Sequence, residues 1–174
     1  MVLLSNEEIE QRVKDSLKEI GVAYDWVEVD PQFADTIVCC EKYGFELDHT
    51  GNTIIVASKR GEKKYAACIV RGVEKLDVNR KVRQLMGVSR LSFANADDTL
   101  QVTQMMIGGV TPFGLPSALP IYIDDTIMNL DYLILGGGSR SAKLIVPPES
   151  LLMIPNTFVT VSYTNLTLPT IDLV

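Results

Sequence analysis

Two glycine-containing segments of the chain have the composition of loops that hold a substrate through the backbone. The first, Gly108–Asp124, reads GGVTPFGLPSALPIYID. Its glycines allow close approach of a ligand and a positive φ, while its prolines stiffen the loop. Such a loop can direct backbone N–H groups at a carbonyl or an oxyanion. Ordinary connections between elements have the same composition, so this segment alone leaves both interpretations open.

The second segment, Gly136–Arg140, reads GGGSR and lies between two predicted strands. It is not followed by the GK[ST] of a Walker phosphate loop, and it lacks the GxGxxG spacing and the helix of a dinucleotide site. A loop of this kind can let an acyl group or a nucleotide lie against bare backbone. It can equally be a flexible hairpin turn.

Histidine, acidic and cysteine side chains offer fewer candidates for catalysis or metal binding. A lone histidine such as His49 is more typical of a loop, although it could act as a general base if it faced a cleft. Asp124 follows a predicted strand, where the role of helix N-cap is more typical than that of acid catalyst. The three cysteines, Cys39, Cys40 and Cys68, form no CxxC motif, so neither a disulfide framework nor a metal site is predicted.

Charge is distributed unevenly along the chain. The net charge is −6, which argues against a protein that coats nucleic acid. Residues 59–90, however, contain ten basic and three acidic residues, a net charge of +7 that leaves −13 for the rest. This stretch could contact phosphates, or it could be a solvated hairpin and helix. The candidate phosphate contacts within it are Lys59, Arg60, Lys63, Lys64, Arg80 and Lys81.

Apolar spacing and turn residues divide the chain into short elements. Ser5 and Glu8 form a capping box in front of a helix predicted over 6–20, which Gly21 ends. Further helices are predicted over 34–43, 78–86 and 97–107, with a helical turn at 125–129 and another opened by Pro147-Pro148-Glu149. Strands are predicted at 23–29, 53–58, 64–70, 91–94, 120–123, 132–135, 142–146 and 158–162.

This order of elements lacks a regular βαβ period, which disfavours a doubly wound sheet. A chain of 174 residues is expected to form one domain, here 1–174. No apolar run approaches the roughly 18–20 residues that cross a bilayer, and MVLLSNEEIEQ lacks the features of a signal peptide. We therefore expect a cytoplasmic protein with no membrane partner.

Several of these segments together resemble the prolyl-tRNA synthetase-associated editing domain and its free-standing relatives, the YbaK family. The resemblance rests on GGVTPFGLP, the strand IYID, the strand and loop YLILGGGSR, and PPESLL. GNTIIVAS and KKYAACIVRGVEKLD resemble the first hairpin of the family and the residues after it. The resemblance covers roughly residues 5–155, which leaves 156–174 as a C-terminal strand and arm. It implies an α/β (α+β) fold with a mixed, partly barrel-like sheet surrounded by short helices.

The resemblance also implies an activity, hydrolysis of the ester between a wrong amino acid and tRNA, with no cofactor. The implied partner is the aminoacyl-adenosine end of a mischarged tRNA, which the basic stretch 59–90 would contact, with an aminoacyl-tRNA synthetase as a further partner. The sequence leaves a monomer or a homodimer open, and the apolar C-terminal arm favours a dimer. A water molecule, helped by a ribose hydroxyl of the tRNA, is the implied nucleophile. The implied catalytic residues include Gly109, Thr111 and Pro112, and the implied substrate-binding residues are Gly108, Phe113, Gly114, Gly136, Gly137, Gly138 and Ser139.

The chain departs from the family pattern at a charged position. The family has a lysine where this chain has Asn52, and asparagine can donate or accept hydrogen bonds but supplies no charge. In an ungapped comparison, Lys143 stands where relatives often have an acidic residue. We hypothesise that Lys143 resupplies the charge, so both residues are catalytic candidates; the alternative is that Lys143 faces solvent.

Three functions are therefore compatible with the sequence. The first is a trans-acting aminoacyl-tRNA deacylase. The second is a catalytically impaired module on the same fold that binds a tRNA 3′ end, an aminoacyl-nucleotide or a protein partner. The third is an esterase for another small acyl ester.

Overall fold

The structure is a computed structural model that describes residues 2–160 and 163–165. Its largest sheet has five strands in the order β5 (Leu91–Phe93), β2 (Gly51–Ser58), β3 (Tyr65–Arg71), β6 (Ile121–Asp124) and β9 (Thr157–Thr160). A second sheet has the order β1 (Asp25–Glu28), β8 (Ala142–Val146) and β7 (Leu133–Gly136). The short strands β4 (Glu74–Leu76) and β10 (Tyr163–Asn165) pair separately.

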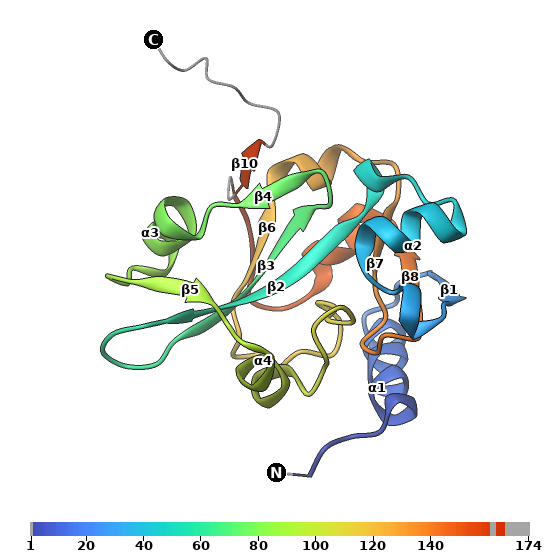
Figure 1. Cartoon of the computed structure of the whole chain (residues 1–174), viewed down its shortest axis with the longest axis horizontal. Coiled ribbons are helices and arrows are strands. Elements are labelled where there is room, and N and C mark those ends of the chain that lie inside the picture. The colour runs from blue at the N-terminus through green and yellow to red at the C-terminus, as the bar shows by residue number, and fades with distance from the viewer. Residues whose placement is uncertain (1, 161–162, 166–174) are drawn as a thin grey trace.

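The sheets contain both parallel and antiparallel pairs. β6 is parallel to β3 and to β9, while the other pairs of the five-stranded sheet are antiparallel. A parallel bridge between Thr50 and Ile134 links the start of β2 to β7 of the second sheet. The sheets do not close into a barrel, but the predicted mixed sheet with short surrounding helices is confirmed (Figure 1).

Helix α1 (Asn6–Glu19) forms as its sequence predicts. Glu8 N donates to Ser5 Oγ at 3.2 Å and Ser5 N donates to Glu8 Oε2 at 2.8 Å, so the capping box is complete. Ile9, Val13 and Leu17 recur at helical spacing and are buried in the main core. The other helical segments are short: η1 (Pro31–Phe33), α2 (Thr36–Tyr43), η2 (Leu47–His49), η3 (Val78–Val82), α3 (Arg83–Met86), α4 (Ala96–Thr103), η4 (Asp125–Asn129) and η5 (Pro148–Met153).

The strands β2 and β3 separate two apolar clusters. Ile55 and Ile69 face the main cluster, which α1 covers, whereas Val56 and Val70 face a smaller cluster on the other side. This alternation is the two-residue period of a strand buried on both faces. No helix in the described part of the chain is long and apolar enough to cross a membrane.

Several predicted boundaries are wrong. The helix predicted over 97–107 ends at Thr103, because Gln104 takes the left-handed conformation with φ 60°. The predicted helix 78–86 consists of a π-helical turn over 78–82 followed by α3, and the turn after Pro147 is a 3-10 helix. Strand β4 was not predicted. The end of the predicted strand 158–162 and most of the C-terminal arm lie outside the described residues.

Candidate functional site

Three adjoining cavities follow strand β2 from Gly51 to Ile55. We call them the inner, central and outer cavities, of which the inner one is the smallest. Asn52, Gly136 and Lys143 line both the inner and the central cavity. The central and outer cavities share Thr53, Ile54, Ile107, Gly108 and Val110. The three cavities therefore form one continuous cleft.

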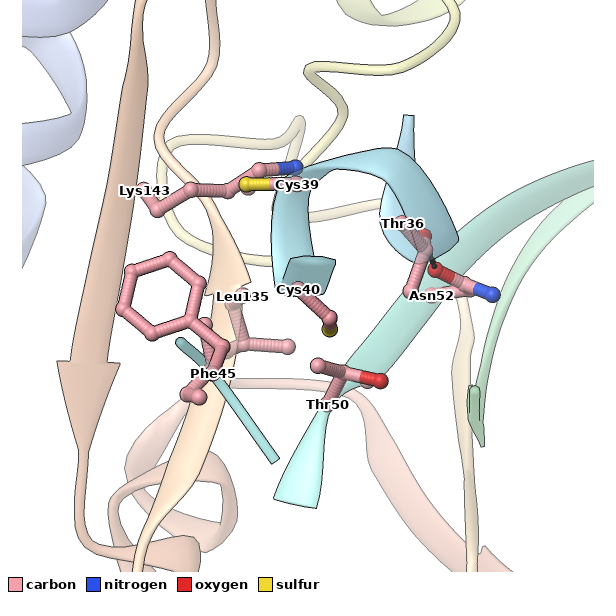
Figure 2. A pocket seen from close by; sticks show the side chains of 11 residues that line it. Thr36, Cys39, Cys40, Phe45, Thr50, Asn52, Leu135 and Lys143 are labelled. Carbon is pink, nitrogen blue, oxygen red and sulfur yellow. Dashed lines mark hydrogen bonds between the residues drawn. The ribbon is translucent and has the colours of Figure 1, made fainter. Parts of the chain in front are cut away.

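The inner cavity lies where α2 crosses the start of β2 and the second sheet (Figure 2). Three of its residues, Thr36, Cys39 and Cys40, come from one face of α2. The remainder come from β2, β7, β8 and the adjoining loops: Phe45, Thr50, Gly51, Asn52, Ile134, Leu135, Gly136 and Lys143.

Lys143 is the buried cation of this cleft. Leu144 and Val146 of β8 face the main core, so the strand alternation turns Lys143 to the opposite side, toward α2. Its register partner on β7 is Gly136, which has no side chain to occupy this space. Only 9% of Lys143 is exposed. In Figure 2 its amino group lies beside Cys39.

The ammonium of Lys143 makes no hydrogen bond or ion pair with another residue among 2–160 and 163–165. Burial lowers the pKa of its ammonium, and the Coulombic influence of Cys39 partly opposes this shift. The same burial raises the pKa of the Cys39 thiol, with Lys143 acting in the opposite direction. Burying an unpaired charge is unfavourable, so this arrangement fits a cation that is paired by a ligand.

Asn52 is held in the same cleft by α2. Thr36 Oγ1 donates a hydrogen bond of 2.7 Å to Asn52 Oδ1. This contact orients the amide and leaves Nδ2 without an acceptor among the described residues. Asn52 and Lys143 thus both line the inner and central cavities, and each has a side-chain donor without an acceptor among the described residues; in Figure 2 the Asn52 amide nitrogen points away from Lys143.

Arg140 fixes the start of the Gly108–Asp124 loop against the cleft. Its Nη1 donates to Ile107 O and to Asp35 Oδ1, each at 3.2 Å, and its Nη2 donates to Pro31 O at 3.2 Å. Gly108 has φ +94°, and a Cβ there would lie 2.0 Å from Arg140 Nη1. A glycine is thus required at the point where the guanidinium crosses the loop.

The other glycines mainly allow two loops to pack together. Gly138 N donates to Gly109 O at 2.7 Å, and a Cβ on Gly109 would lie 2.5 Å from the carbonyl carbon and oxygen of Ser139. Gly138 approaches α1, and the buried Ser139 hydroxyl donates to Glu10 of that helix. Of the GGGSR loop, only Gly136 lines the inner and central cavities.

The cleft thus contains only part of the sequence-predicted site. It brings together Asn52, Gly108, Gly136 and Lys143. Gly109 lies directly behind its wall. The remaining predicted residues of the two loops line none of the three cavities: Thr111, Pro112, Phe113, Gly114, Gly137, Gly138 and Ser139. Phe113 is fully buried in the main core, and Thr111 is buried with its hydroxyl unpaired.

Sequence reasoning missed the contribution of α2. Thr36, Cys39 and Cys40 have the spacing i, i+3, i+4, which places them on one helix face. The helix predicted over 34–43 already has this spacing, but nothing in the sequence indicates that this face of the helix covers β2. Phe45, Phe93 and Ile107 were missed for the same reason.

The predicted tRNA contacts lie at one end of the five-stranded sheet (Figure 1). Four of them surround the exposed turn between β2 and β3: Lys59, Arg60, Lys63 and Lys64. Arg80 and Lys81 lie on η3, which contacts β5 beside β2. The backbone N–H of Lys59 also donates to Arg90 O at 3.0 Å. This basic end begins at Lys59, seven residues after Asn52, so the basic residues and Asn52 lie at opposite ends of β2.

His49 and Asp124 lie outside the three cavities. Asp124 accepts a hydrogen bond from Thr126 N at 3.2 Å, which confirms its prediction as a helix N-cap. His49 Nδ1 and Nε2 each lie 2.8 Å from a carboxylate oxygen, of Asp48 and Asp131 respectively. Glu46, Asp48 and His49 place potential ligand atoms within 4.8 Å of one another, but these carboxylates surround an imidazole that already pairs with them.

The histidine cluster gives a pH-dependent prediction. The hydrogen bond to Asp48 raises the pKa of His49, and Asp131 raises it further. A raised folded-state pKa stabilises the fold fully below the ordinary value of about 6.5, and the contribution is lost as the pH rises through the folded-state pKa. We expect His49→Asn to lower the urea midpoint more at pH near 6 than at pH near 8.5.

Asp131→Asn provides the matched control for this cluster. It removes the Nε2 partner and keeps the imidazole. In the Asp131→Asn background, the decrease of the urea midpoint caused by His49→Asn is expected to depend less on pH. Equal effects of His49→Asn at both pH values in the wild-type background would contradict the assignment.

Comparison with known proteins identifies the family of the chain that forms this cleft. The model of the family described as aminoacyl-tRNA editing domain matches residues 30–154. The chain belongs to the aminoacyl-tRNA editing domain family. The matched residues contain α2, β2, the Gly108–Asp124 loop, β7 and β8, and hence all the residues that line the three cavities.

Two curated proteins resemble this editing domain. Uncharacterized protein YwhH of Bacillus subtilis (strain 168) is 29% identical over 128 residues, which cover 73% of this chain and 78% of that protein. Prolyl-tRNA editing protein ProX of Acetoanaerobium sticklandii is 23% identical over 146 residues, covering 81% and 87% respectively.

Solved structures share the fold of this editing domain. A candidate trans-editing enzyme for prolyl tRNA synthetase superposes with a TM-score of 0.77 at 22% identity, over 92% of this chain and 99% of that chain. Hypothetical protein APE2540 superposes with a TM-score of 0.77 at 21% identity, over 88% and 99%. At these identities the likeness shows the fold alone.

Proposed function

We propose that this editing domain is a trans-acting deacylase that hydrolyses the ester between a wrong amino acid and tRNA. The observation that carries the proposal is the largely buried Lys143 side chain, whose ammonium has no partner among the described residues and which lines the same two cavities as Asn52. Membership of the editing family and similarity to a protein named as a prolyl-tRNA editing protein support the same activity.

In the proposed complex the acyl group enters the inner cavity and the ribose occupies the central cavity. The ester carbonyl oxygen accepts a hydrogen bond from Lys143 Nζ, and Asn52 Nδ2 donates to another polar atom of the substrate. Water adds to the carbonyl carbon, the bond to the ribose oxygen breaks, and the ribose oxygen takes up a proton. The products are the free amino acid and the tRNA 3′ end. Lys143 stabilises the charge that develops on the carbonyl oxygen, which is the part of the reaction that fixed donors favour most.

The remaining predicted residues receive indirect roles in this proposal. Gly108 and Gly136 keep the central cavity open, because side chains there would meet Arg140 or the backbone of Gly109 and Val110. The basic end of the sheet contacts tRNA phosphates, so binding is expected to weaken as salt rises. We place the activity in the cytoplasm as one domain over 1–174, acting on tRNA released by a synthetase.

A binding module on the same fold is the second candidate. Asn52 favours it, because Asn52 has no charge and its Oδ1 is already engaged by Thr36. In that case Lys143 and Asn52 would hold an aminoacyl-nucleotide or a tRNA end without promoting attack by water. The two candidates differ in whether the protein hydrolyses the ester after binding it.

A panel of tRNAs, each charged with one wrong amino acid, separates these candidates. The measurements are the rate of ester loss with and without the protein, and the affinity for each tRNA. Hydrolysis of at least one ester well above its spontaneous rate is the expected result. Binding without hydrolysis, with turnover gained in Asn52→Lys, would favour the binding module. Hydrolysis confined to small acyl esters that lack tRNA would identify an esterase of another kind, and inactivity without binding would contradict both.

A further inference from the structure

We propose that the outer cavity binds the unpaired base at the 3′ end of the tRNA by stacking on Phe93, so that the substrate lies along β2 in one defined direction. The acyl group lies at the Gly51 end of the strand, and the phosphates of the preceding nucleotides approach the β2–β3 turn. This inference rests on the proposed function and adds to it a base-binding residue and a polarity.

The order of the cavities along β2 supports this direction. Asn52 lines the inner and central cavities, Thr53 and Ile54 line the central and outer cavities, and Ile55 lines the outer cavity alone. A strand advances by about 3.3 Å per residue, so Asn52 and Ile55 are about 10 Å apart. A base attached to a ribose in the central cavity would therefore reach the outer cavity.

The composition of the outer cavity fits an aromatic ligand. No charged residue lines it. Phe93 of β5 is 57% exposed and Ile107 is 51% exposed, although both are large apolar side chains. They border the cavity together with the partly buried Ile54. Bases of single-stranded nucleic acid bind protein chiefly by stacking on such aromatic side chains, and every base has a π face that can do so.

The charge distribution distinguishes this direction from the reverse. Lys59, Arg60 and Lys64 are exposed beyond the outer cavity, at the turn that follows β2. At the other end, Lys143 is the one cation among the described residues that line the inner cavity. The reverse orientation would bring several phosphates to this single cation and the acyl group to the basic turn. Continuity of the cleft and charge complementarity thus favour the same orientation.

The chain contains a matched control for Phe93. Phe158 is 50% exposed and lies on β9, at the opposite edge of the same sheet. We expect Phe93→Ala to raise KM for a hydrolysed mischarged tRNA about tenfold with little change in kcat. Phe93→Trp should keep KM close to the wild-type value, and Phe158→Ala should leave KM unchanged. Hydrolysis of the methyl ester of the same amino acid, which has no base, should be insensitive to Phe93→Ala.

Binding of a single-stranded oligonucleotide that ends in CCA tests the inference without hydrolysis. Phe93→Ala should weaken this binding about tenfold relative to the wild type and to Phe158→Ala. Equal affinity of the three proteins would overturn the base-stacking site even if the wild type hydrolyses mischarged tRNA. Conversely, loss of binding in Phe93→Ala alone would support the base-stacking site even if the wild type hydrolyses no ester. The binding experiment therefore distinguishes failure of the base-stacking site from failure of the proposed hydrolysis.

Discussion

Replacing Lys143 by methionine is expected to slow ester hydrolysis by about 100-fold or more and to leave the protein at least as stable as the wild type. The rate falls because the variant removes the only cation in the cavity wall beside Asn52. Removing one oxyanion donor from an acyl-transfer site commonly has an effect of this size. Methionine keeps most of the side-chain volume, so the cavity walls should persist.

The stability of Lys143→Met should change in the opposite direction from its activity. The wild-type Lys143 side chain is largely buried and its ammonium is unpaired among the described residues, and replacing largely buried charge by an apolar side chain is often stabilising by about 1 kcal/mol. Because the folded-state pKa is lowered, the unfolded chain binds more protons as the pH approaches the ordinary lysine value. Wild-type stability therefore rises through that range, and the advantage of the variant should shrink there.

Lys18→Met is the matched control for this prediction. Lys18 is exposed in the last turn of α1 and lines none of the three cavities. Its replacement should change the free energy of unfolding by less than about 0.5 kcal/mol and leave hydrolysis unchanged. Retention of full activity in Lys143→Met would contradict the proposed role of Lys143. A loss of activity accompanied by an equal loss of folded protein would show a structural role instead.

Gly109→Ala is expected to lower the free energy of unfolding by about 3 kcal/mol. The added Cβ would lie 2.5 Å from the carbonyl carbon and oxygen of Ser139, which are backbone atoms that no rotamer change can move. The two loops would have to separate, and the hydrogen bond from Gly138 N to Gly109 O would lengthen. Urea unfolding followed by circular dichroism measures the effect.

Gly61→Ala controls for the general effect of replacing a loop glycine. Gly61 has φ +73° and no neighbour within 4 Å of a Cβ, so this variant introduces only left-handed backbone strain, of about 1–2 kcal/mol. Gly109 is not among the glycines with positive φ, so its replacement isolates the steric effect. A Gly109→Ala protein as stable as Gly61→Ala would contradict the close packing of the two loops.

Local sequence signals predicted the elements that depend on local interactions. The capping box and apolar spacing located α1, and the β-branched run and turn located the β2–β3 hairpin. The end of α4 was predicted wrongly, because the residue that ends it in the left-handed conformation is Gln104 and not the glycine that usually marks such an end. Strand β4 depends on its pairing with β10, about 90 residues later in the chain.

The candidate site was predictable only where a motif lies in the cleft itself. Gly108, Gly136 and Asn52 belong to segments that carry the family resemblance, and all three line the central cavity. Phe113 lies in the same motif but packs in the main core, because the loop turns inward after Val110. The contribution of α2 depends on how that helix crosses two sheets, which no local pattern determines.

A crystal structure of the protein with a stable aminoacyl-adenosine, in which an amide replaces the ester, tests the central claim most directly. The amino acid of the analogue is the one whose ester is hydrolysed fastest. The predicted complex has the acyl carbonyl oxygen about 2.7–3.2 Å from Lys143 Nζ and the base against Phe93. An analogue bound outside the three cavities, or bound with its acyl group at Phe93, would contradict the account.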